Sequence, residues 1–557
     1  MTDVTLSRRK LIAGASAAGI ALAGAGAMMG SRPGTSALAQ ETAATPTPLG
    51  DPVPPEFGVD GNWPVENYNL SGTRSATGSN ISTSTAGQLG LGWSVEIPSG
   101  AAAFGSLTAN PIIAGDLLYI QDATSNVYAF NKETGDQVWT NPLNDAVPTG
   151  GPNGIAAAYG LLFTTAGGTA DVVALKQDTG EEVWRTNILG PLNEGITTAP
   201  GVYDSVVYVS TIPGTPEAFY GGGQRGVIHA LDAGTGAVLW YFDTTTDNLW
   251  GNPRVNSGGG FWHPPSFDSD GQMYVGIGNP APYPGTEEWP SGTSHPGDNL
   301  YTDCILKFDP SVGTLTWYYQ MKPHDIFDLD NQLTPILADL DDGRKVAFTS
   351  GKNGYVACVD RESGQAYWKV PVGTHKNDLA TYIPEGGVVE VWPGTLGGVE
   401  TPLAFANNLV LAGVYEWPSY YTPSDFDTSH PFDFSTATGV IVALNAADGT
   451  TAWEVKVPSG PLAGITVAND ILFSAGLDGA IMGLNLADGS EVFRYQAPAG
   501  VNTSPAIAGD YIYWAAGGPL LASSNTVNPP DKPTATVFAL KIGGTMQSAT
   551  PEASPTS

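Results

Sequence analysis

The chain has 557 residues, of which only 14% are charged, and its 71 Gly and 44 Pro give it a turn-rich composition. Its 54 acidic and 22 basic residues give a formal net charge of −32. A negative field of this size argues against nucleic acid or an anionic membrane as a partner, and it is compatible with a basic protein partner. The two Cys residues, Cys304 and Cys358, are too few for a disulfide framework and lack the spacing of a zinc site.

The N-terminal segment has the pattern of an export signal. Ser7-Arg8-Arg9-Lys10 precedes an apolar run of small residues over 13–29, and Ala37-Leu38-Ala39 offers a cleavage site before Gln40. We interpret residues 1–39 as a twin-arginine signal, with a retained membrane anchor as the alternative. Processing would leave a mature protein without a membrane span, in the periplasm or outside the cell.

Two segments rich in Pro, Thr, Ala and Ser flank the rest of the chain. Residues 40–56 are predicted to form a disordered linker, and residues 544–557 a disordered tail. The chain between them, 57–543, is expected to form one long β-rich unit, because repeat folds of this kind grow without dividing into domains.

One pattern recurs through this unit. An apolar strand is followed by a turn that ends in Gly, and an aromatic residue stands four positions after that Gly. Trp makes up only 14 of the 557 residues, so its recurrence at one offset is not an effect of composition. We interpret each copy as a β-hairpin whose Trp packs between neighbouring sheets. The pairs are Gly135/Trp139, Gly180/Trp184, Gly236/Trp240, Gly313/Trp317, Gly364/Trp368, Gly449/Trp453 and Gly489/Phe493.

The spacing of the copies predicts a ring of four-stranded sheets. Two half-copies remain besides the complete ones, at Trp93 before the first copy and at residues 536–541 after the last. If the two terminal strands share one sheet, the fold is an all-β, eight-bladed β-propeller closed by its N- and C-terminal strands, which also protects the sheet edges. A seven-bladed ring with a loose extra strand is the alternative.

One copy is followed by a polar insert that no other copy has. Residues 323–330, PHDIFDLD, place three carboxylates and one imidazole together in a chain with only six His. A repeat that carries a singular polar insert is typical of a scaffold that presents a functional site. Asp residues that cap a solvated turn are the alternative interpretation.

The repeat resembles the tryptophan-docking repeat of the pyrroloquinoline quinone (PQQ) propeller family. The opening over 62–75, with its Asn-Trp-Pro and Gly-Thr-Arg-Ser motifs, looks like the N-terminal segment of that family. Residues 297–303, 317–320 and 323–330 are similar to the PQQ-dependent alcohol dehydrogenases in particular. The resemblance covers about 60–541. The same blades also serve non-catalytic relatives, including outer-membrane assembly scaffolds.

The resemblance implies oxidation of an alcohol or sugar hydroxyl by hydride transfer to PQQ, with a metal ion as Lewis acid. Asp328 would be the base that removes the substrate proton. The chain has no CxxCH motif for a covalent haem, so electrons would pass to a separate acceptor such as a cytochrome c. A catalytically silent propeller that binds a protein or glycan is the alternative function.

The resemblance also implies a metal site built from oxygen ligands, which suit calcium or a lanthanide ion. Asn279 lies in a segment that matches the metal-ligating Asn of the family, and Asp330 resembles the extra carboxylate of the lanthanide-dependent enzymes. Gly221–Gly223 stand where the family has a Glu ligand, and Glu217 is the upstream substitute. The candidate metal ligands are therefore Asn279, Asp328, Asp330 and Glu217.

The quinone slot has one predicted wall. Trp262 matches the Trp that lies flat under the quinone, Lys352 matches the basic residue that contacts its oxygens, and Asn279 adjoins both cofactor and metal. Packing between blades and simple solvation are the alternatives for Trp262 and Lys352. The family's adjacent Cys pair is missing, since the Gly- and Pro-containing residues 149–156 include no Cys, and Glu400 stands where the family has a cofactor-contacting Asn.

Overall fold

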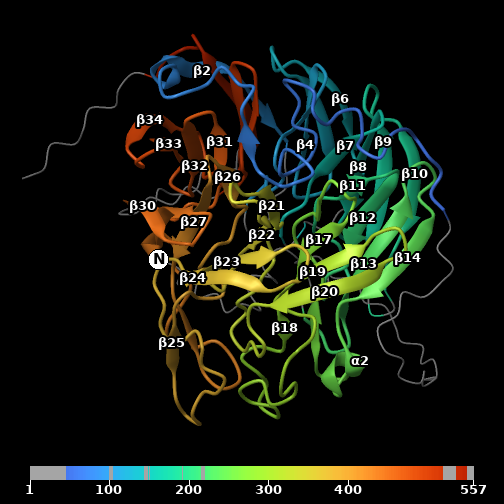
Figure 1. Ribbon diagram of the computed structural model, residues 1–557, viewed down its shortest axis with the longest axis vertical. Helices are drawn as coiled ribbons and strands as arrows, with labels where there is room; N and C mark the ends of the chain where they lie inside the picture. The colour runs from blue at the N-terminus through green and yellow to red at the C-terminus, as the bar shows by residue number, and fades with distance from the viewer. Residues whose placement is uncertain are drawn as a thin grey trace, which may run out of the picture.

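The computed structural model describes residues 45–98, 105–143, 149, 151–190, 192, 194–214, 220–518 and 535–547. These residues form a ring of eight four-stranded antiparallel sheets, which confirms the predicted eight-bladed propeller (Figure 1). The twin-arginine segment 1–39, Glu217 and residues 548–557 lie outside the described residues.

The first four blades follow one another in chain order. Blade 1 contains β3 (Ile112–Ala114), β4 (Leu117–Gln121), β5 (Val127–Asn131) and β6 (Gln137–Asn141). Blade 2 contains β7 (Ile155–Ala158), β8 (Leu161–Ala166), β9 (Asp171–Lys176) and β10 (Glu182–Asn187). Blade 3 contains β11 (Gly201–Tyr203), β12 (Val206–Ser210), β13 (Arg225–Asp232) and β14 (Val238–Asp243). Blade 4 contains β16 (Ser266–Phe267), β17 (Met273–Gly276), β19 (Cys304–Asp309) and β20 (Thr314–Gln320).

The remaining blades complete the ring. Blade 5 contains β21 (Ile336–Asp339), β22 (Lys345–Thr349), β23 (Tyr355–Asp360) and β24 (Ala366–Pro371). Blade 6 contains β26 (Ala404–Ala406), β27 (Leu409–Glu416), β29 (Thr438–Asn445) and β30 (Thr451–Val457). Blade 7 contains β31 (Thr466–Ala468), β32 (Ile471–Ala475), β33 (Ala480–Asn485) and β34 (Glu491–Gln496). Blade 8 contains β35 (Ala506–Ala508), β36 (Tyr511–Ala516), β37 (Ala535–Ile542) and β2 (Leu89–Ile97).

Blade 8 joins the two ends of the described chain. Strand β2 supplies its outermost strand and pairs antiparallel with β37, from Leu89 opposite Ile542 to Ile97 opposite Ala535. In Figure 1 the blue strand β2 accordingly lies against the red C-terminal strands. Closure by both termini, as predicted, leaves each blade with a neighbour on either side.

The repeat Trp residues dock onto the next blade, in agreement with the prediction that each Trp packs between neighbouring sheets. Each repeat Gly contacts the Trp of the preceding copy rather than its own. A Cβ at Gly180 would lie 2.5 Å from Cε3 of Trp139, whose Nε1 donates a 3.1 Å hydrogen bond to the carbonyl of Gln177. The full set is Trp93/Gly135, Trp139/Gly180, Trp184/Gly236, Trp240/Gly313, Trp317/Gly364, Trp368/Gly449 and Trp453/Gly489.

A single N-terminal segment, residues 62–80, runs along the inner strands of the ring. Strand β1 (Ser75–Ala76) within it pairs in parallel with β31. Its backbone bonds successively to seven blades, through the pairs Trp63–Ile113, Pro64–Ala157, Leu70–Phe267, Ser71–Leu337, Thr73–Phe405, Arg74–Val467 and Asn80–Gly509. Arg74 is fully buried and donates side-chain hydrogen bonds to the carbonyls of Glu66, Ile465 and Pro505.

Residues 45–56 differ from the disordered linker expected over 40–56. They lie against turns of blades 2 and 3, where the Thr47 and Leu49 amides donate to the Asp232 carboxylate and the Ser205 hydroxyl. The buried Glu56 carboxylate accepts hydrogen bonds from the amides of Tyr159 and Gly160. These side-chain acceptors give the Pro-rich stretch fixed partners that its composition does not reveal.

Long connections from blades 3 to 6 gather into a lobe at the lower end of the view in Figure 1. They carry α2 (Asp247–Trp250), β15 (Ser257–Gly259), β18 (Pro280–Ala281), β25 (Val389–Val391) and β28 (Ser419–Tyr421), with η2 (Phe434–Thr436) nearby and η1 (Ala86–Gln88) beside blade 8. Ile326, Phe327 and Leu329 of the polar insert are buried with Ile383, Val391 and Tyr421 of this lobe. The lobe therefore fixes the insert in place.

Both Cys residues, Cys304 and Cys358, are buried and unpaired. Among the described residues, no helix is long and apolar enough to cross a membrane.

Candidate active site

The polar insert leaves β20 and folds into a tight buried turn. Its first carboxylate organises this turn, because Asp325 accepts hydrogen bonds from the amides of Phe327 and Leu329 at 2.9 and 2.6 Å. The Lys322 ammonium lies 3.2 Å from Asp325 and balances its charge. Asp328 adopts a positive φ of 65° between the apolar anchors Phe327 and Leu329, and its carboxylate contacts Lys352 and Thr395. The turn is capped by an Asp, as one interpretation expected, but it is buried.

Lys352 joins the two other carboxylates of the insert. Its Nζ lies 3.4 Å from Asp328 Oδ1 and 3.1 Å from Asp330 Oδ2, and all three side chains are largely buried. The Thr395 hydroxyl donates a short hydrogen bond to the other oxygen of Asp328. The Asn353 amide group donates to the carbonyl of Asp330 at 2.8 Å, which ties the Lys352 turn to the insert.

Asn279 lies beside this ion pair. Its backbone N–H donates to Asp330 Oδ1 at 3.1 Å, and its side-chain Oδ1 accepts a 2.9 Å hydrogen bond from the Tyr220 hydroxyl. The structure thus brings Asn279, Asp328, Asp330 and Lys352 into one chain of contacts.

Trp262 lies beside the same group of residues, because its indole packs on Gly278, the residue before Asn279. A Cβ at Gly278 would lie 2.8 Å from the indole Nε1, and a Cβ at Gly151 would lie 2.9 Å from Cζ3. The stretch 149–156, where an opposite wall was expected, therefore does reach Trp262. It meets the indole with a glycine, which has no side chain to cover the ring at that point.

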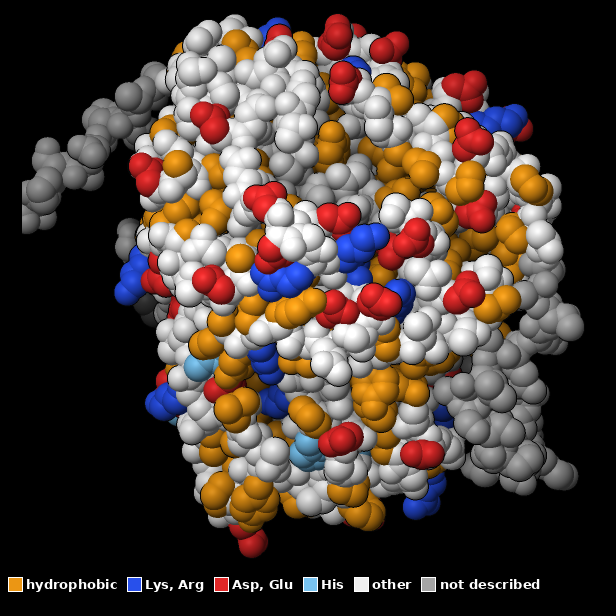
Figure 2. Space-filling view, viewed as in Figure 1, with side chains coloured by type: hydrophobic (Ala, Val, Ile, Leu, Met, Phe, Trp, Pro, Cys, Tyr) orange, Lys and Arg blue, Asp and Glu red, His pale blue; other side chains and the backbone are white. Residues whose placement is uncertain are grey.

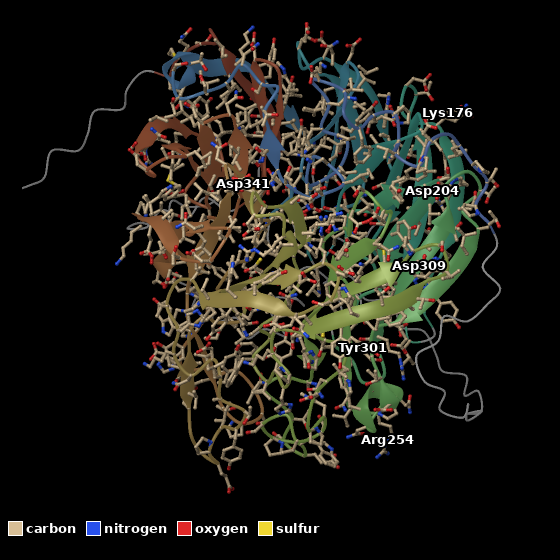
Figure 3. The ribbon with its side chains drawn as sticks, viewed as in Figure 1. Lys176, Asp204, Arg254, Tyr301, Asp309 and Asp341 are labelled. Carbon is tan, nitrogen blue, oxygen red and sulfur yellow. The ribbon has the colours of Figure 1, made fainter. Side chains whose placement is uncertain are left out.

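The missing Glu ligand has a steric explanation. Gly222, in the Gly-rich segment expected to carry it, packs its backbone against the carbonyl of Arg254, and a Cβ there would collide with that oxygen. Arg254 lies beside α2 at the lower edge of the lobe (Figure 3). Whether Glu217 takes over this role remains a proposal, since it lies outside the described residues.

Sequence reasoning missed several polar residues that the fold brings to the site. Asp303 is fully buried, and neither carboxylate oxygen has a hydrogen-bond partner among the described residues. Glu400 was noted only as a lost Asn, yet its Oε1 atom is shielded from solvent, and its negative charge helps to raise the pKa of Lys352. Tyr220 and Thr395 come from loops with no recognisable motif. Only Asp303 carried a signal, as the last residue of the 297–303 segment.

The electrostatics of the site follow from burying several carboxyl groups around one ammonium. Burial raises the pKa of Asp330 to about 7, although Lys352 opposes the rise. Burial would lower the pKa of Lys352, but Asp328 and Asp330 outweigh it and hold that pKa well above its usual value. Burial, and then the negative charges of neighbouring Asp residues, raise the pKa of Asp303 well above its usual range.

The residues present fit a hard cation beside a flat ring. Asn279 Oδ1 and the carboxylates of Asp328 and Asp330 are oxygen donors of the kind that calcium and lanthanide ions prefer. The two carboxylates are held together by the Lys352 ammonium, a positive charge already at this place. Within the described residues no three acidic, His or Cys side chains converge on one point, so the neutral amide oxygen of Asn279 would have to act as a ligand beside the two carboxylates.

Comparison with known proteins places this site in context. Residues 189–377 match the family described as the glucose/ethanol/alcohol dehydrogenase β-propeller domain, and residues 437–530 match the outer membrane protein assembly factor BamB. The quinohemoprotein alcohol dehydrogenase of Comamonas testosteroni is 27% identical over 59% of this chain and 49% of its own. The enzyme ADH IIB of Pseudomonas putida is 26% identical over 74% of this chain and 66% of its own. The chain thus spans about half to two thirds of the length of these curated relatives.

Solved structures show the same fold. The Comamonas testosteroni enzyme superposes with a TM-score of 0.74 at 23% identity, covering 88% of this chain and 82% of that one. A europium-containing methanol dehydrogenase superposes with a TM-score of 0.68 at 21% identity, covering 87% and 98%. The chain is therefore an eight-bladed propeller similar to those of the PQQ-dependent alcohol dehydrogenases.

Proposed function

We propose that this protein is an exported quinoprotein dehydrogenase that oxidises an alcohol or sugar hydroxyl. The observation that carries the proposal is the buried group Asn279, Asp328, Asp330 and Lys352, brought together next to Trp262 from three separate segments. Burying several ionisable groups costs free energy even when they are paired, and a buried cluster with strongly shifted pKa values is typical of a functional site.

Asp328 is the proposed base. It would receive the hydroxyl proton of the substrate on a carboxylate oxygen, and burial in the insert keeps bulk water from competing for that proton. The Thr395 hydroxyl donates to its Oδ2 and Lys352 lies 3.4 Å from its Oδ1, and both contacts favour the ionised form. The backbone bonds to Asp325 hold the turn, so Asp328 need not reorganise to act.

PQQ and its metal ion are the proposed cofactors. When bound, PQQ would accept the substrate hydride while calcium or a lanthanide ion polarises the quinone carbonyl. Trp262 would stack on the flat face of the quinone, and Lys352 would contact the quinone oxygens. Asn279, Asp328 and Asp330 would be ligands of the metal ion.

We further propose a periplasmic or extracellular location, based on the twin-arginine pattern over 1–39, and electron transfer to a separate acceptor. The 1-butanol dehydrogenase of Thauera butanivorans, 27% identical over 61% of this chain, is named for cytochrome c. A cytochrome with a basic surface would be attracted electrostatically to a protein with a net charge of −32.

Titration of the purified protein with PQQ tests the proposal. Indole fluorescence is followed with calcium, with a lanthanide ion and with a chelator. We expect stoichiometric quenching that requires the metal ion, because a quinone stacked on Trp262 quenches that indole. The Trp262→Phe variant should bind with less quenching. Absence of quenching under all three conditions would instead favour a silent propeller that binds a protein or glycan partner.

A further inference from the structure

Trp262, the proposed stacking face for the quinone, lies in a short stretch outside the sheets. Residues 261–265 belong to no strand. Pro264 and Pro265 have no amide hydrogen to donate, so the backbone after the indole has few hydrogen bonds open to it. Both prolines also line a hollow together with Val65, which limits the packing beneath them. The orientation of the indole therefore depends on contacts that other segments supply.

The blades hold this stretch on its N-terminal side. The Gly260 amide donates to the Thr244 hydroxyl at 2.8 Å, and the Phe261 amide donates to the Ser210 hydroxyl at 3.2 Å. The Phe261 side chain is fully buried in the core of blades 3 and 4. Trp262 thus follows a residue that the blades fix firmly.

Side chains hold the stretch on its C-terminal side. The Nδ1–H of His263 donates to Oε1 of Glu66 at 2.7 Å, and both side chains are largely buried. Thr334 adds a second connection, because its hydroxyl donates to the Pro264 carbonyl at 2.6 Å and accepts from the Asn67 side-chain amide at 2.8 Å. The two residues after the indole are thus tied to the N-terminal segment that runs along the inner strands.

Glu66 is itself held from the opposite side of the ring. Its carbonyl accepts hydrogen bonds from the Trp63 indole at 3.2 Å and from the guanidinium of Arg74. Arg74 is fully buried and also donates to the carbonyls of Ile465 and Pro505, which directly precede the first strands of blades 7 and 8. The Glu66 carboxylate therefore has a fixed position relative to several blades.

The pair of Glu66 and His263 is not explained by stability alone. The second carboxylate oxygen of Glu66 is shielded from solvent and has no hydrogen-bond partner among the described residues. Burial of such an oxygen costs free energy, and replacing a buried ion pair by apolar side chains of similar volume is often neutral or stabilising. What an apolar pair cannot supply is a fixed direction for the imidazole.

We infer that Glu66 is a positioning residue for the cofactor. Through His263 it holds the backbone after Trp262, and so it fixes the plane on which the quinone stacks. This inference rests on the quinone of the proposed function and adds a residue that lies outside the motifs of the site. Stacked rings prefer particular distances and offsets, so a loosened indole should bind the cofactor more weakly.

Two measurements on the full-length protein test this inference. The first is fluorine NMR of protein labelled with fluorinated tryptophan, recorded without quinone, in which the Trp262 signal is identified by its loss in Trp262→Phe. The second is the affinity for PQQ from equilibrium dialysis, in the presence of calcium or a lanthanide ion. The wild type is compared with Glu66→Leu, Glu66→Gln and the double variant Glu66→Leu/His263→Leu.

Glu56→Leu is the matched control. It also removes a buried carboxylate near the start of the described chain, but one that accepts hydrogen bonds from the amides of Tyr159 and Gly160 in blade 2. It should leave both the Trp262 signal and the affinity for PQQ unchanged. Denaturant unfolding of each variant gives its stability.

We expect Glu66→Leu to shift and broaden the Trp262 signal and to weaken PQQ binding about tenfold, because the indole is no longer held in one orientation. Glu66→Gln should stay within about threefold of the wild type, since its amide oxygen can still accept from His263. The double variant should be at least as stable as Glu66→Leu and still bind PQQ about tenfold more weakly than the wild type. An apolar pair would restore a contact that only stabilised the fold, but it would not restore a positioning contact.

Three results would overturn the inference and leave the proposed function standing. An unmoved Trp262 signal in Glu66→Leu would show that the indole is held without the pair. Wild-type affinity in the double variant would show that quinone binding does not need the pair. An equal loss in Glu56→Leu would make the effect one of general destabilisation. If the wild type itself bound no PQQ, the proposed function would fall, and with it any role of Glu66 in cofactor binding.

Discussion

Three aspartates within six residues have different roles because of their backbone positions. Asp325 accepts two amide hydrogen bonds and shapes the turn, Asp328 is held with a positive φ, and Asp330 is bonded to the amide of Asn279. Chemically identical side chains are thus divided into a structural carboxylate and two that face Lys352. The distinction lies in geometry, which the letters PHDIFDLD do not state.

Replacement of Asp328 by Asn should abolish alcohol oxidation, by at least about a thousandfold in kcat, because the amide cannot take up the hydroxyl proton. PQQ binding should persist, since Trp262 and Lys352 remain. The measurement is turnover with a dye acceptor together with quinone titration. Asp342→Asn, at an exposed turn of blade 5, is the control. Turnover within tenfold of the wild type would remove Asp328 from the role of base.

At the residue scale the sequence predicted those candidate site residues that belong to motifs. Asn279, Asp328, Asp330, Lys352 and Trp262 were predicted, and the structure places all five together. Residues delivered by other loops were not predicted, because a contact between distant segments leaves no local pattern. Glu400 shows this limit: its identity was noted, but the bond from the Val399 amide to the Gly351 carbonyl, which brings its loop to the Lys352 turn, could not be predicted.

At the scale of elements, the blades are joined by an indole and a glycine from neighbouring copies. The repeat predicted both residues and the packing of each Trp between sheets, but not which Gly each Trp meets, because that contact joins two successive copies. The structure places Trp240, from blade 3, on Gly313 of blade 4, and the indole N–H donates to the carbonyl of Pro310 at 2.8 Å. The joint between blades 7 and 8 has Phe493 in place of Trp and so lacks the indole donor.

Gly313→Ala should therefore destabilise the protein more than Gly343→Ala. Both glycines have positive φ values, 65° and 86°, so each substitution costs about 1 to 2 kcal/mol from the backbone. A Cβ at Gly313 would also lie 2.6 Å from the Trp240 ring, which adds about 1 to 3 kcal/mol of overpacking, whereas nothing lies within 4 Å at Gly343. Denaturant unfolding of the two variants measures the difference. Equal losses of stability would show that the docking contact tolerates a methyl group.

At the scale of the whole molecule, the sequence predicted the ring and its closure correctly, because regular repeats and two half-copies at the ends specify a closed fold. The path of residues 45–56 could not be predicted, since Pro-rich composition resembles disorder unless acceptors such as Asp232 and Ser205 are known to be nearby. Figure 2 shows acidic side chains scattered over the visible face, so the net charge of −32 acts as a broad field.

This field should make electron transfer to a basic acceptor sensitive to salt. We expect the second-order rate with a basic cytochrome c to fall at least tenfold as ionic strength rises from about 10 to about 500 mM, because screening removes the attraction at distances beyond about 10 Å. The rate with an uncharged dye should change little and serves as the control. Parallel salt curves for the two acceptors would argue against electrostatic steering.

The segment over 62–80 has a kinetic consequence. Its hydrogen bonds reach blades made from residues up to Gly509, and β2 cannot pair until β37 exists. Contacts between such distant parts of a chain form late, because the entropy cost of closing a long loop comes before the contacts can stabilise the fold. We expect the individual hairpins to form early and the ring to close in one slow final step. In the closed ring, no blade can detach until the hydrogen bonds of residues 62–80 break. The protein should therefore unfold more slowly than its equilibrium stability alone would suggest.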